Sequence, residues 1–516
     1  METTKEIQRL IDIFARYKDK VFIIDSITNK EFTYGNIEEL SLRLATLISE
    51  KGINKGDRIA IILPNCIEFI LIYFSCMQIG AIPVPINIKL HKTEIISILN
   101  ESDPKLLFLN SINNNLNDLS NKVETLFLCL TGNSSLKEFD LLATIKEKKQ
   151  YSSVLFDNIV DSDTFIIGYT SGTTNKPKGV EFSYKNIISN GCSFIQMVEL
   201  DSNSRFYEIL SLSYTAGFYN LLIVPALLGG SVVLDSAFEI STALNFWKKV
   251  QKYQVNVLWL VPSIISMILS LNYSSNDLKY CNSRNIKAVF SCTAPLSENL
   301  QESFELKFSL PLRNTYGLSE LLFVSANLPS QIRNKGVGKI LPGCKVAIIN
   351  ADGGELSSER FGEIVVKSDY MNQSYYKHNL EITAINKDCF YTGDMGFLSA
   401  DGFLYITDRK KDLIIRGGIN ISPAEIEEII RKDKAVNEVA VIGLPHELQG
   451  EEIVAILNVG SGFSEKQLLE RCRSSLASFK IPNRFLYVDH FPRSVTGKIQ
   501  KTKLKESFKN SVYCPN

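Results

Sequence analysis

The chain has 516 residues, and 56 Lys and Arg side chains balance 56 Asp and Glu side chains, so its formal net charge is zero. At roughly 150 residues per domain this length predicts about three folding units, which large α/β folds often fuse into one body. Apolar residues make up 45% and charged residues 22%, which excludes a disordered, collagen-like or coiled-coil chain. Because no net charge gathers nucleic acid or anionic lipid from a distance, we expect a small-molecule site and no nucleic-acid partner.

The ten cysteines include no C-x-x-C pair and no histidine at metal-ligand spacing, so we expect neither a disulfide framework nor a zinc site. The N-terminal sequence METTKEIQRL lacks the apolar stretch of a secretory signal, which predicts a cytoplasmic location. Residues 209–234 carry no charge and are long enough to span a membrane. Since this run contains Pro225, Gly229 and Gly230, we expect buried core or pocket lining there and no transmembrane segment.

Short apolar strands repeatedly lead through a turn into an amphipathic helix. In the first case residues 58–63 are the strand, Asn65 is expected to cap the helix with Glu68 three residues later, and Gly80 ends it. Strands predicted at 164–168, 255–260 and 287–291 are followed by helices that begin at Ser183, at Ser263 and near Ser297. This alternation predicts an α/β fold of mostly parallel sheets covered by helices.

The pattern changes after about residue 407. A predicted strand at 412–416 leads through Gly417 and Gly418 to Ser422-Pro423-Ala424-Glu425, which combines an N-cap serine, a proline at the first helical position and a returning glutamate. Strands at 436–443, 453–459 and 484–488 and a helix capped by Ser464 complete an expected α+β domain of about 100 residues. We therefore expect domains at 1–407 and 408–516. The charged residues 407–412 between them form either a hinge or a solvated loop.

Residues 169–180, with the sequence YTSGTTNKPKGV, follow a predicted buried strand. Their hydroxyl, backbone N–H and ammonium groups can turn toward one polyanion, which makes the segment a candidate phosphate-binding loop. It is not a Walker loop, because Gly-Lys-Ser/Thr is absent. A polar surface turn is the alternative interpretation.

Further motifs follow this loop in order along the chain: Thr315-Tyr316-Gly317-Leu318-Ser319-Glu320, Tyr391-Thr392-Gly393-Asp394, Asp408-Arg409-Lys410-Lys411-Asp412 and Pro492-Arg493-Ser494-Val495-Thr496-Gly497-Lys498. The set resembles the superfamily of adenylate-forming enzymes, which comprises acyl-CoA and aryl-CoA ligases, luciferases and the adenylation domains of peptide synthetases. With its flanks the match covers about residues 30 to 501. The resemblance implies a large N-terminal domain and a small mobile C-terminal domain. It also implies that a carboxylate attacks the α-phosphorus of ATP to give an acyl-adenylate and pyrophosphate, after which a thiol takes the acyl group.

The resemblance implies how the triphosphate is held. Positioning and charge neutralisation dominate transfer at phosphorus, and the loop residues expected to hold the β- and γ-phosphates are Thr170, Ser171, Gly172, Thr173, Thr174 and Lys178. Glu320 matches the glutamate that helps to hold Mg²⁺, a cation that prefers oxygen ligands. On residue type alone, Glu320 would be interpreted as a solvated surface acid.

The resemblance also assigns the nucleoside. Tyr316, between Thr315 and Gly317, would stack on the adenine, and the hydroxyl of Ser319 would reach the α-phosphate. Asp394 matches the ribose-binding aspartate, and Arg409 would contact the ribose or the adenylate. On residue type alone Tyr316 is a core residue, Thr-Gly-Asp is a common turn, and Arg409 is a solvated charge.

The small domain contributes the remaining groups. Lys498 is expected to bridge the carboxylate of the acid and the α-phosphate, which relieves their mutual repulsion as they approach. Lys411 occupies the hinge position, and after rotation of the domain the Gly417-Gly418 side would face the pantetheine thiol. An ordinary surface lysine is the alternative for Lys498, since several lysines follow it.

The acid pocket departs from the usual family pattern. Its expected wall residues are Tyr214, Gly217, Phe218, Thr293, Ala294 and Thr315. Tyr184 and Tyr214 replace frequent histidines, and Asn175 replaces a loop glycine, which asparagine tolerates through left-handed conformations. No acidic residue adjoins Tyr214, which disfavours a free α-amino acid. Cys292 and Thr293 are bulkier than the glycine and alanine common in the family, and this predicts a short, branched or aryl acid unless core packing explains them.

These observations predict an acid–thiol ligase that uses ATP and Mg²⁺ and transfers the acyl group to CoA. The alternative acceptor is the pantetheine arm of a carrier protein, which would then be a partner. A nucleotide-binding protein that has lost catalysis is an alternative of another class.

Overall fold

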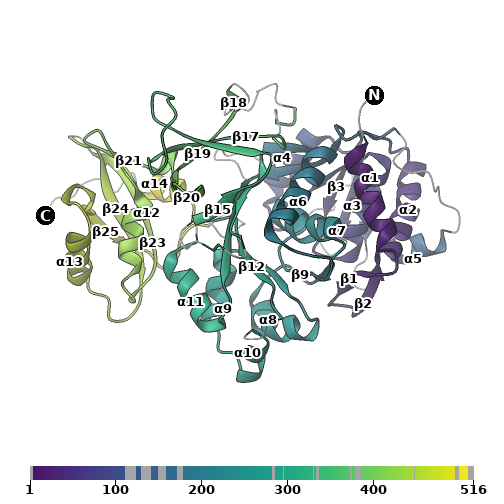
Figure 1. The fold of residues 1–516 in the computed structure, drawn as a ribbon, viewed down its shortest axis with the longest axis horizontal. Coiled ribbons are helices and arrows are strands. Elements are labelled where there is room, and N and C mark those ends of the chain that lie inside the picture. The colour runs from purple at the N-terminus through teal and green to yellow at the C-terminus, as the bar shows by residue number, and fades with distance from the viewer. Residues whose placement is uncertain are drawn as a thin grey trace.

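The structure is a computed structural model that describes residues 4–110, 124–128, 141–148, 158–170, 178–281, 285–294, 296–328, 331–332, 336–371, 375–377, 385–386, 389–446, 448–493 and 499–508. Figure 1 shows a large body that begins with α1 at the right and a small body at the left that carries α12, α13 and α14.

The large body is organised around one 14-stranded sheet. Its first part is a parallel block in the order β13-β12-β11-β9-β10-β1, with β2 antiparallel at the edge. These strands are β1 (Val21–Asp25), β2 (Lys30–Thr33), β9 (Arg205–Glu208), β10 (Ser231–Leu234), β11 (Val257–Leu260), β12 (Ala288–Ser291) and β13 (Leu312–Leu318).

Helices bury both faces of the parallel block. Along β11, Val257 and Trp259 point into the core beneath α6, while Leu258 and Leu260 point into the core beneath α8 and α9. Strands covered on both faces are continuously apolar, as the sequence predicts. The helices of the large body are α1 (Lys5–Arg16), α2 (Tyr34–Glu50), α3 (Ile67–Ile79), α4 (Lys92–Ser102), α5 (Leu141–Glu147), α6 (Tyr184–Val198), η2 (Ala216–Ile223), α7 (Val224–Leu228), α8 (Ile240–Lys252), α9 (Pro262–Ser270), α10 (Ser275–Cys281) and α11 (Glu298–Phe308).

The second part of the large sheet is antiparallel and follows β13 in the order β14-β15-β20-β19-β17-β16, with β18 on β19. Its strands are β14 (Leu322–Ala326), β15 (Gly336–Ile340), β16 (Cys344–Ile349), β17 (Gly362–Ser368), β18 (Ile385–Asn386), β19 (Cys389–Leu398) and β20 (Phe403–Arg409). The last residue of β20, Arg409, pairs with Asp394 of β19. The large sheet therefore continues past the domain boundary proposed at residue 407.

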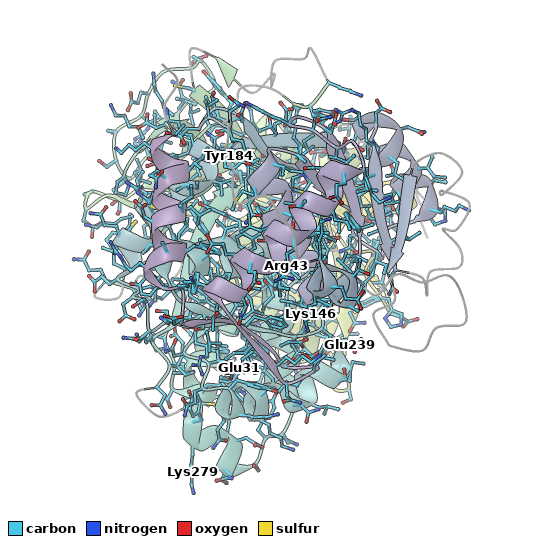
Figure 2. All side chains as sticks on the ribbon, turned by 90° about the vertical axis from the view of Figure 1, so that its right-hand side faces the viewer. Glu31, Arg43, Lys146, Tyr184, Glu239 and Lys279 are labelled. Atoms are coloured by element: carbon cyan, nitrogen blue, oxygen red, sulfur yellow. The ribbon has the colours of Figure 1, made fainter. Side chains whose placement is uncertain are left out.

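Two smaller sheets complete the large body. One is wholly parallel in the order β4-β3-β5-β6, and the other is the antiparallel pair of β7 and β8. Their strands are β3 (Arg58–Ile62), β4 (Ile82–Pro85), β5 (Leu106–Asn110), β6 (Glu124–Leu128), β7 (Thr164–Thr170) and β8 (Lys178–Ser183). Beside them α2 and α5 meet where Nη1 of Arg43 donates to the carbonyl of Lys146 at 2.8 Å, and Figure 2 labels both residues.

Several helix boundaries match the predictions, and one predicted cap does not. Ser183 and Ser297 accept the backbone N–H groups of Asn186 and Leu300, and Gly80 ends α3 with φ 70°. Asn65 does not cap α3, whose N-cap is Cys66.

The side chain of Asn65 binds distant loops. Its amide donates to the carbonyls of Leu210 and Asp235 at 2.7 and 3.1 Å, and its oxygen accepts from the N–H of Leu212 at 2.9 Å. The predicted cap was wrong because this tertiary bonding competes with local capping.

The uncharged run 209–234 forms η2, α7 and β10, whose residues are almost all buried. This confirms the expectation of core or pocket lining. Among the residues that the structure describes, no helix has the length and apolar character needed to cross a membrane.

The small body is an α+β domain with a 5-stranded sheet in the order β22-β21-β24-β23, with β25 on β24. Its elements are η3 (Lys410–Asp412), β21 (Ile414–Arg416), β22 (Ile419–Ile421), α12 (Pro423–Arg431), β23 (Val436–His446), β24 (Gly450–Val459), α13 (Glu465–Ser475), η4 (Ser478–Lys480), β25 (Arg484–Tyr487) and α14 (Lys501–Phe508). Ser422 and Ser464 cap α12 and α13 as predicted. The carboxylate of Glu425 instead binds Lys480, with 2.7 Å between the charged atoms.

A buried carboxylate connects α12, β23 and α14. Glu427 is 6% exposed and accepts from Nζ of Lys501 at 2.7 Å, from Nη2 of Arg431 at 2.9 Å and from the N–H of Val441 at 2.8 Å. These cations and hydrogen bonds lower the pKa of Glu427 against the opposing effect of burial. Breaking such a pair leaves a buried charge uncompensated, so the network holds the start of α14 firmly.

Candidate active site

The segment 315–320 leaves the parallel block where β13 passes from β12 to β14. The hydroxyl of Thr315 donates to the carbonyl of Ser291 at 3.2 Å, which joins the ends of two adjacent strands. A Cβ at Gly317 would lie 2.2 Å from the carbonyl oxygen of Leu322. The turn that presents Ser319 and Glu320 therefore requires glycine at 317.

Tyr316, Asp394 and Arg409 form one bonded group. The hydroxyl of Tyr316 donates to Oδ2 of Asp394 at 2.6 Å, and Nε of Arg409 lies 2.5 Å from Oδ1. Asp394 is 4% exposed, and charge-assisted bonds of this kind are stronger than neutral ones. Burial and the neighbouring carboxylate raise the pKa of Tyr316 well above its usual value, so its hydroxyl remains a donor.

The sequence did not predict the bond between Tyr316 and Asp394. As the residue type suggests, the ring of Tyr316 lies in a core cluster and is 8% exposed. Asp394 is inside strand β19 and not in a turn, although Gly393 before it has φ 67°. A contact between residues 78 positions apart leaves no local sequence signal.

Glu320 lies beside Tyr375, which belongs to none of the predicted motifs. Oε1 of Glu320 accepts from the hydroxyl of Tyr375 at 2.9 Å. The ammonium of Lys178, the first residue of β8, lies 5.0 Å from the centroid of the Tyr375 ring. The structure thus links the predicted metal-binding carboxylate to the predicted phosphate-binding lysine through one tyrosine.

The chemistry of Glu320 fits magnesium. Its carboxylate is half-buried and supplies the hard oxygen that Mg²⁺ prefers. The described ranges hold no group of three or more His, Cys, Asp or Glu side chains that could bind a metal. Magnesium commonly binds through one or two carboxylates together with phosphates and water, so a single carboxylate is compatible with a magnesium site.

Part of the predicted site lies outside the described residues. Thr170 ends β7 and Lys178 begins β8. The predicted phosphate-loop residues between these positions, Ser171, Gly172, Thr173 and Thr174, and the predicted catalytic Lys498 lie outside the described residues. Asn175 lies outside as well.

One half of the predicted acid pocket adjoins β7, the strand before the predicted phosphate-binding loop. Tyr214 and Phe218 line a cavity together with Gly168 of β7. A Cβ at Gly217 would lie 2.2 Å from the carbonyl oxygen of Ser211, so this close approach requires glycine. The hydroxyl of Tyr214 is buried without a hydrogen bond to any residue that the structure describes, and burial raises its pKa.

The other half lies at the ends of β12 and β13. Thr293 has φ 72°, which is strained for a β-branched residue, and it precedes Ala294 on the way to α11. Next to it, Nδ2 of Asn220 in η2 lies 3.8 Å from Sγ of Cys292. This contact joins the two halves.

Aromatic rings fill the space beneath Cys292. Its Sγ accepts from Nε1 of Trp259 at 2.8 Å. The Trp259 ring stacks on Phe290 and Phe323, with centroids 4.7 and 5.5 Å away, and Phe323 stacks on Phe194 at 4.1 Å. We call these residues, Phe194, Trp259, Phe290 and Phe323, the aromatic floor. All are buried.

Tyr184, at one of the positions where the family often has histidine, is a core residue. Its hydroxyl donates to the carbonyl of Met77 at 2.7 Å, and its ring packs edge-on against Phe165. Tyr184, which Figure 2 labels, is fully buried.

The junction between the bodies consists of the end of β20 and the short helix η3. Arg409 ends β20, Lys411 lies in η3, and burial lowers the pKa of Lys411. Asp408 accepts from the hydroxyl of Ser422 and from the N–H of Ala424 at 3.1 Å, which fastens β20 to the start of α12. Burial raises the pKa of Asp408 to about 6.

Gly417 and Gly418 form the turn between β21 and β22, with φ 57° and 81°. The N–H of Gly417 donates to the carbonyl of Gln449 at 2.8 Å. A Cβ at either glycine would meet no described atom within 4 Å, so both are needed for their backbone conformation and not for space.

Comparison with protein families identifies this architecture. Residues 12–376 match the model of the AMP-binding enzyme family, and residues 425–498 match that of the AMP-binding enzyme C-terminal domain. The chain belongs to the AMP-binding enzyme family. This AMP-binding enzyme is 30% identical over 498 residues to a long-chain-fatty-acid–CoA ligase of Mycobacterium tuberculosis, a match that covers 95% of each chain. It is 29% identical over 503 residues to an oxalate–CoA ligase of Arabidopsis thaliana, over 94% of this chain and 95% of the relative.

Solved structures give the same result for the AMP-binding enzyme. ATP-bound MatB from Rhodopseudomonas palustris superimposes with a TM-score of 0.87 at 25% identity and covers 97% of this chain and 99% of its own. The o-succinylbenzoate CoA synthetase of Bacillus subtilis, in complex with its acyl-adenylate, gives 0.83 at 26% identity and covers 96% and 97%. The predicted fold class, a large domain with a mostly parallel sheet and a small C-terminal domain, is confirmed.

Proposed function

We infer that the chain is an AMP-forming acid–CoA ligase. It activates a carboxylic acid with ATP to an acyl-adenylate and transfers the acyl group to CoA, as the relatives' CoA ligase names support. The observation that carries the residue roles is the bonded group of Tyr316, Asp394 and Arg409, because it brings three residues of the expected nucleoside site, from β13, β19 and β20, to one carboxylate. Arg409 lies just after the proposed boundary between domains 1–407 and 408–516.

The nucleoside site is proposed around this group. Asp394 receives the ribose hydroxyls, and each of its oxygens has two lone pairs, so a ribose can bind beside the existing partners. Tyr316 provides a flat face for the adenine, between Thr315 and Gly317. Arg409 supplies positive charge at the same carboxylate.

The triphosphate is proposed to lie between the β7–β8 loop and Glu320. Lys178 neutralises phosphate charge, and the hydroxyl of Ser319 reaches the α-phosphate. Magnesium, when bound at Glu320, would withdraw charge from the phosphate oxygens. Lys498 then offsets the repulsion between the carboxylate and the α-phosphate.

The acid is proposed to be small. Tyr214, Phe218, Thr293 and Ala294 are the proposed wall, and we propose that the close-packed aromatic floor beneath Cys292 leaves no room for a long acyl chain. The named relatives act on acids as different as oxalate and long-chain fatty acids. The size of the acid must therefore be inferred from the pocket residues of this chain.

Replacing Trp259 with leucine should extend the range of acids. The smaller side chain opens the floor, and the ratio of activation of longer to shorter straight-chain acids should rise about tenfold. Pyrophosphate exchange across a chain-length series measures this ratio. The matched control is Trp247→Leu, because Trp247 is equally buried but packs on the other face of the sheet. An equal change in the ratio for both variants would contradict the role of Trp259.

CoA is the proposed acceptor, delivered past Gly417 and Gly418, and the pantetheine arm of a carrier protein is the alternative. Acid-dependent exchange of pyrophosphate into ATP, measured with purified protein over a broad acid panel, tests activity and selectivity together. Offering CoA and a phosphopantetheinylated carrier protein with the preferred acid then separates the acceptors. Absence of exchange with every acid would favour a nucleotide-binding protein without catalysis.

A further inference from the structure

Tyr375 is held against the phosphate-binding hairpin by the backbone. It forms an antiparallel bridge with Val180 of β8, and the N–H of Tyr376 donates to the carbonyl of Gly179 at 2.9 Å. Lys178 begins the same strand. Any displacement of the hairpin therefore moves the Tyr375 ring with it.

From this position the Tyr375 side chain contacts two charged groups. Its hydroxyl donates to Oε1 of Glu320 at 2.9 Å, and its ring faces the ammonium of Lys178, 5.0 Å from the centroid. A donated hydrogen bond fixes the orientation of a carboxylate, and a ring face attracts a cation. One half-buried side chain thus fixes the position of the Glu320 carboxylate relative to the Lys178 ammonium.

The hydroxyl of Tyr375 is suited to this role by its position. It donates to one oxygen of the Glu320 carboxylate, Oε1. A carboxylate has two oxygens, each with two lone pairs, so Glu320 can bind a metal while it accepts this hydrogen bond.

We propose that Tyr375 is a positioning residue that holds the metal-binding carboxylate of Glu320 and the phosphate-binding ammonium of Lys178 in one fixed arrangement. The proposal rests on the proposed function, since it takes the metal role of Glu320 from there. It predicts that Tyr375 acts on the binding of magnesium with ATP, in addition to packing against the cores on either side of it.

The test measures equilibrium binding of ATP by calorimetry over a range of free Mg²⁺, with neither acid nor CoA present. Tyr375→Phe keeps the ring over Lys178 and removes only the donor to Glu320. The half-saturating Mg²⁺ concentration should rise about tenfold, the usual effect of removing a group that orients a metal ligand, while ATP binding without Mg²⁺ stays unchanged. Tyr375→Leu also removes the ring and should weaken ATP binding without Mg²⁺.

Tyr376→Phe is the matched control. The neighbouring hydroxyl donates to the carbonyl of Ser102 at 3.3 Å, on the α4 side, and its loss should leave the Mg²⁺ dependence unchanged. An unchanged Mg²⁺ dependence in Tyr375→Phe would overturn the proposal. Equal weakening of ATP binding with and without Mg²⁺ would also overturn it, because that result indicates a packing role alone.

Glu320→Gln separates this proposal from the function on which it rests. If Glu320→Gln raises the Mg²⁺ requirement and Tyr375→Phe does not, Glu320 binds the metal without help from Tyr375. If neither variant changes the requirement, the proposed metal role of Glu320 fails. In the Glu320→Gln background, Tyr375→Phe should have no further effect on Mg²⁺, because the two substitutions remove the same interaction.

Discussion

Lys498→Ala should abolish acyl-adenylate formation while leaving transfer from supplied acyl-adenylate to CoA intact. The ammonium is proposed to act only where two anionic groups approach each other, and removal of one such stabilising group costs about 10²–10³-fold in rate. In the second half-reaction the acid is already joined to AMP, so that repulsion is gone. Acid-dependent pyrophosphate exchange measures the first step, and thioester formation from synthetic acyl-adenylate measures the second.

Lys503→Ala is the control for this prediction. Lys503 is exposed on α14, the helix that follows the motif at residues 492–498, so its loss should change neither half-reaction. Equal loss of both half-reactions in Lys498→Ala would contradict the assigned role and indicate a general defect.

Asp394→Ala should weaken use of ATP by about a hundredfold or more. Two hydrogen bonds from ribose hydroxyls to a carboxylate contribute about 1.5–3 kcal/mol each, and the substitution also leaves Tyr316 and Arg409 without their shared partner. The kcat/KM for ATP in pyrophosphate exchange, at saturating acid, measures the effect.

Tyr316→Phe separates the ribose bonds from the support of Asp394. It keeps the aromatic face for the adenine and removes only the bond to Oδ2 of Asp394, so its effect should be clearly smaller than that of Asp394→Ala. An Asp394→Ala protein that uses ATP normally but binds the acid poorly would place Asp394 outside the ribose site.

Features set by nearby residues could be predicted from the sequence. Ser422 and Ser464 cap their helices as predicted, and the helices predicted to begin at Ser183 and near Ser297 are capped by those serines. Each hydroxyl needs only a backbone N–H three residues ahead. The alternation of apolar strands and helices likewise gave the parallel block, since both faces of those strands are covered.

Features that depend on distant partners could not be predicted in this way. Asn65 matched a local capping pattern, yet its amide binds loops more than a hundred residues away in sequence, as the separation of 145 residues to Leu210 shows. No local sequence pattern marks Tyr375, because its proposed role depends on contacts with Glu320 and Lys178, which are distant in sequence. The family resemblance pointed to Asp394 and Glu320, but not to the hydrogen bonds that Tyr316 and Tyr375 donate to them.

The buried contacts of Glu427 limit how Lys498 could be withdrawn from the proposed site. Lys501, three positions after Lys498, is tied through Glu427 to α12 and β23, so the beginning of α14 shares the rigid frame of the small domain. If α14 detached to withdraw Lys498, the buried carboxylate of Glu427 would lose its ion pair with Lys501. We therefore propose that the small body turns as one unit about residues 410–413, which breaks the bonds of Asp408 to Ser422 and Ala424. A cross-link between the two bodies should arrest the enzyme between its half-reactions.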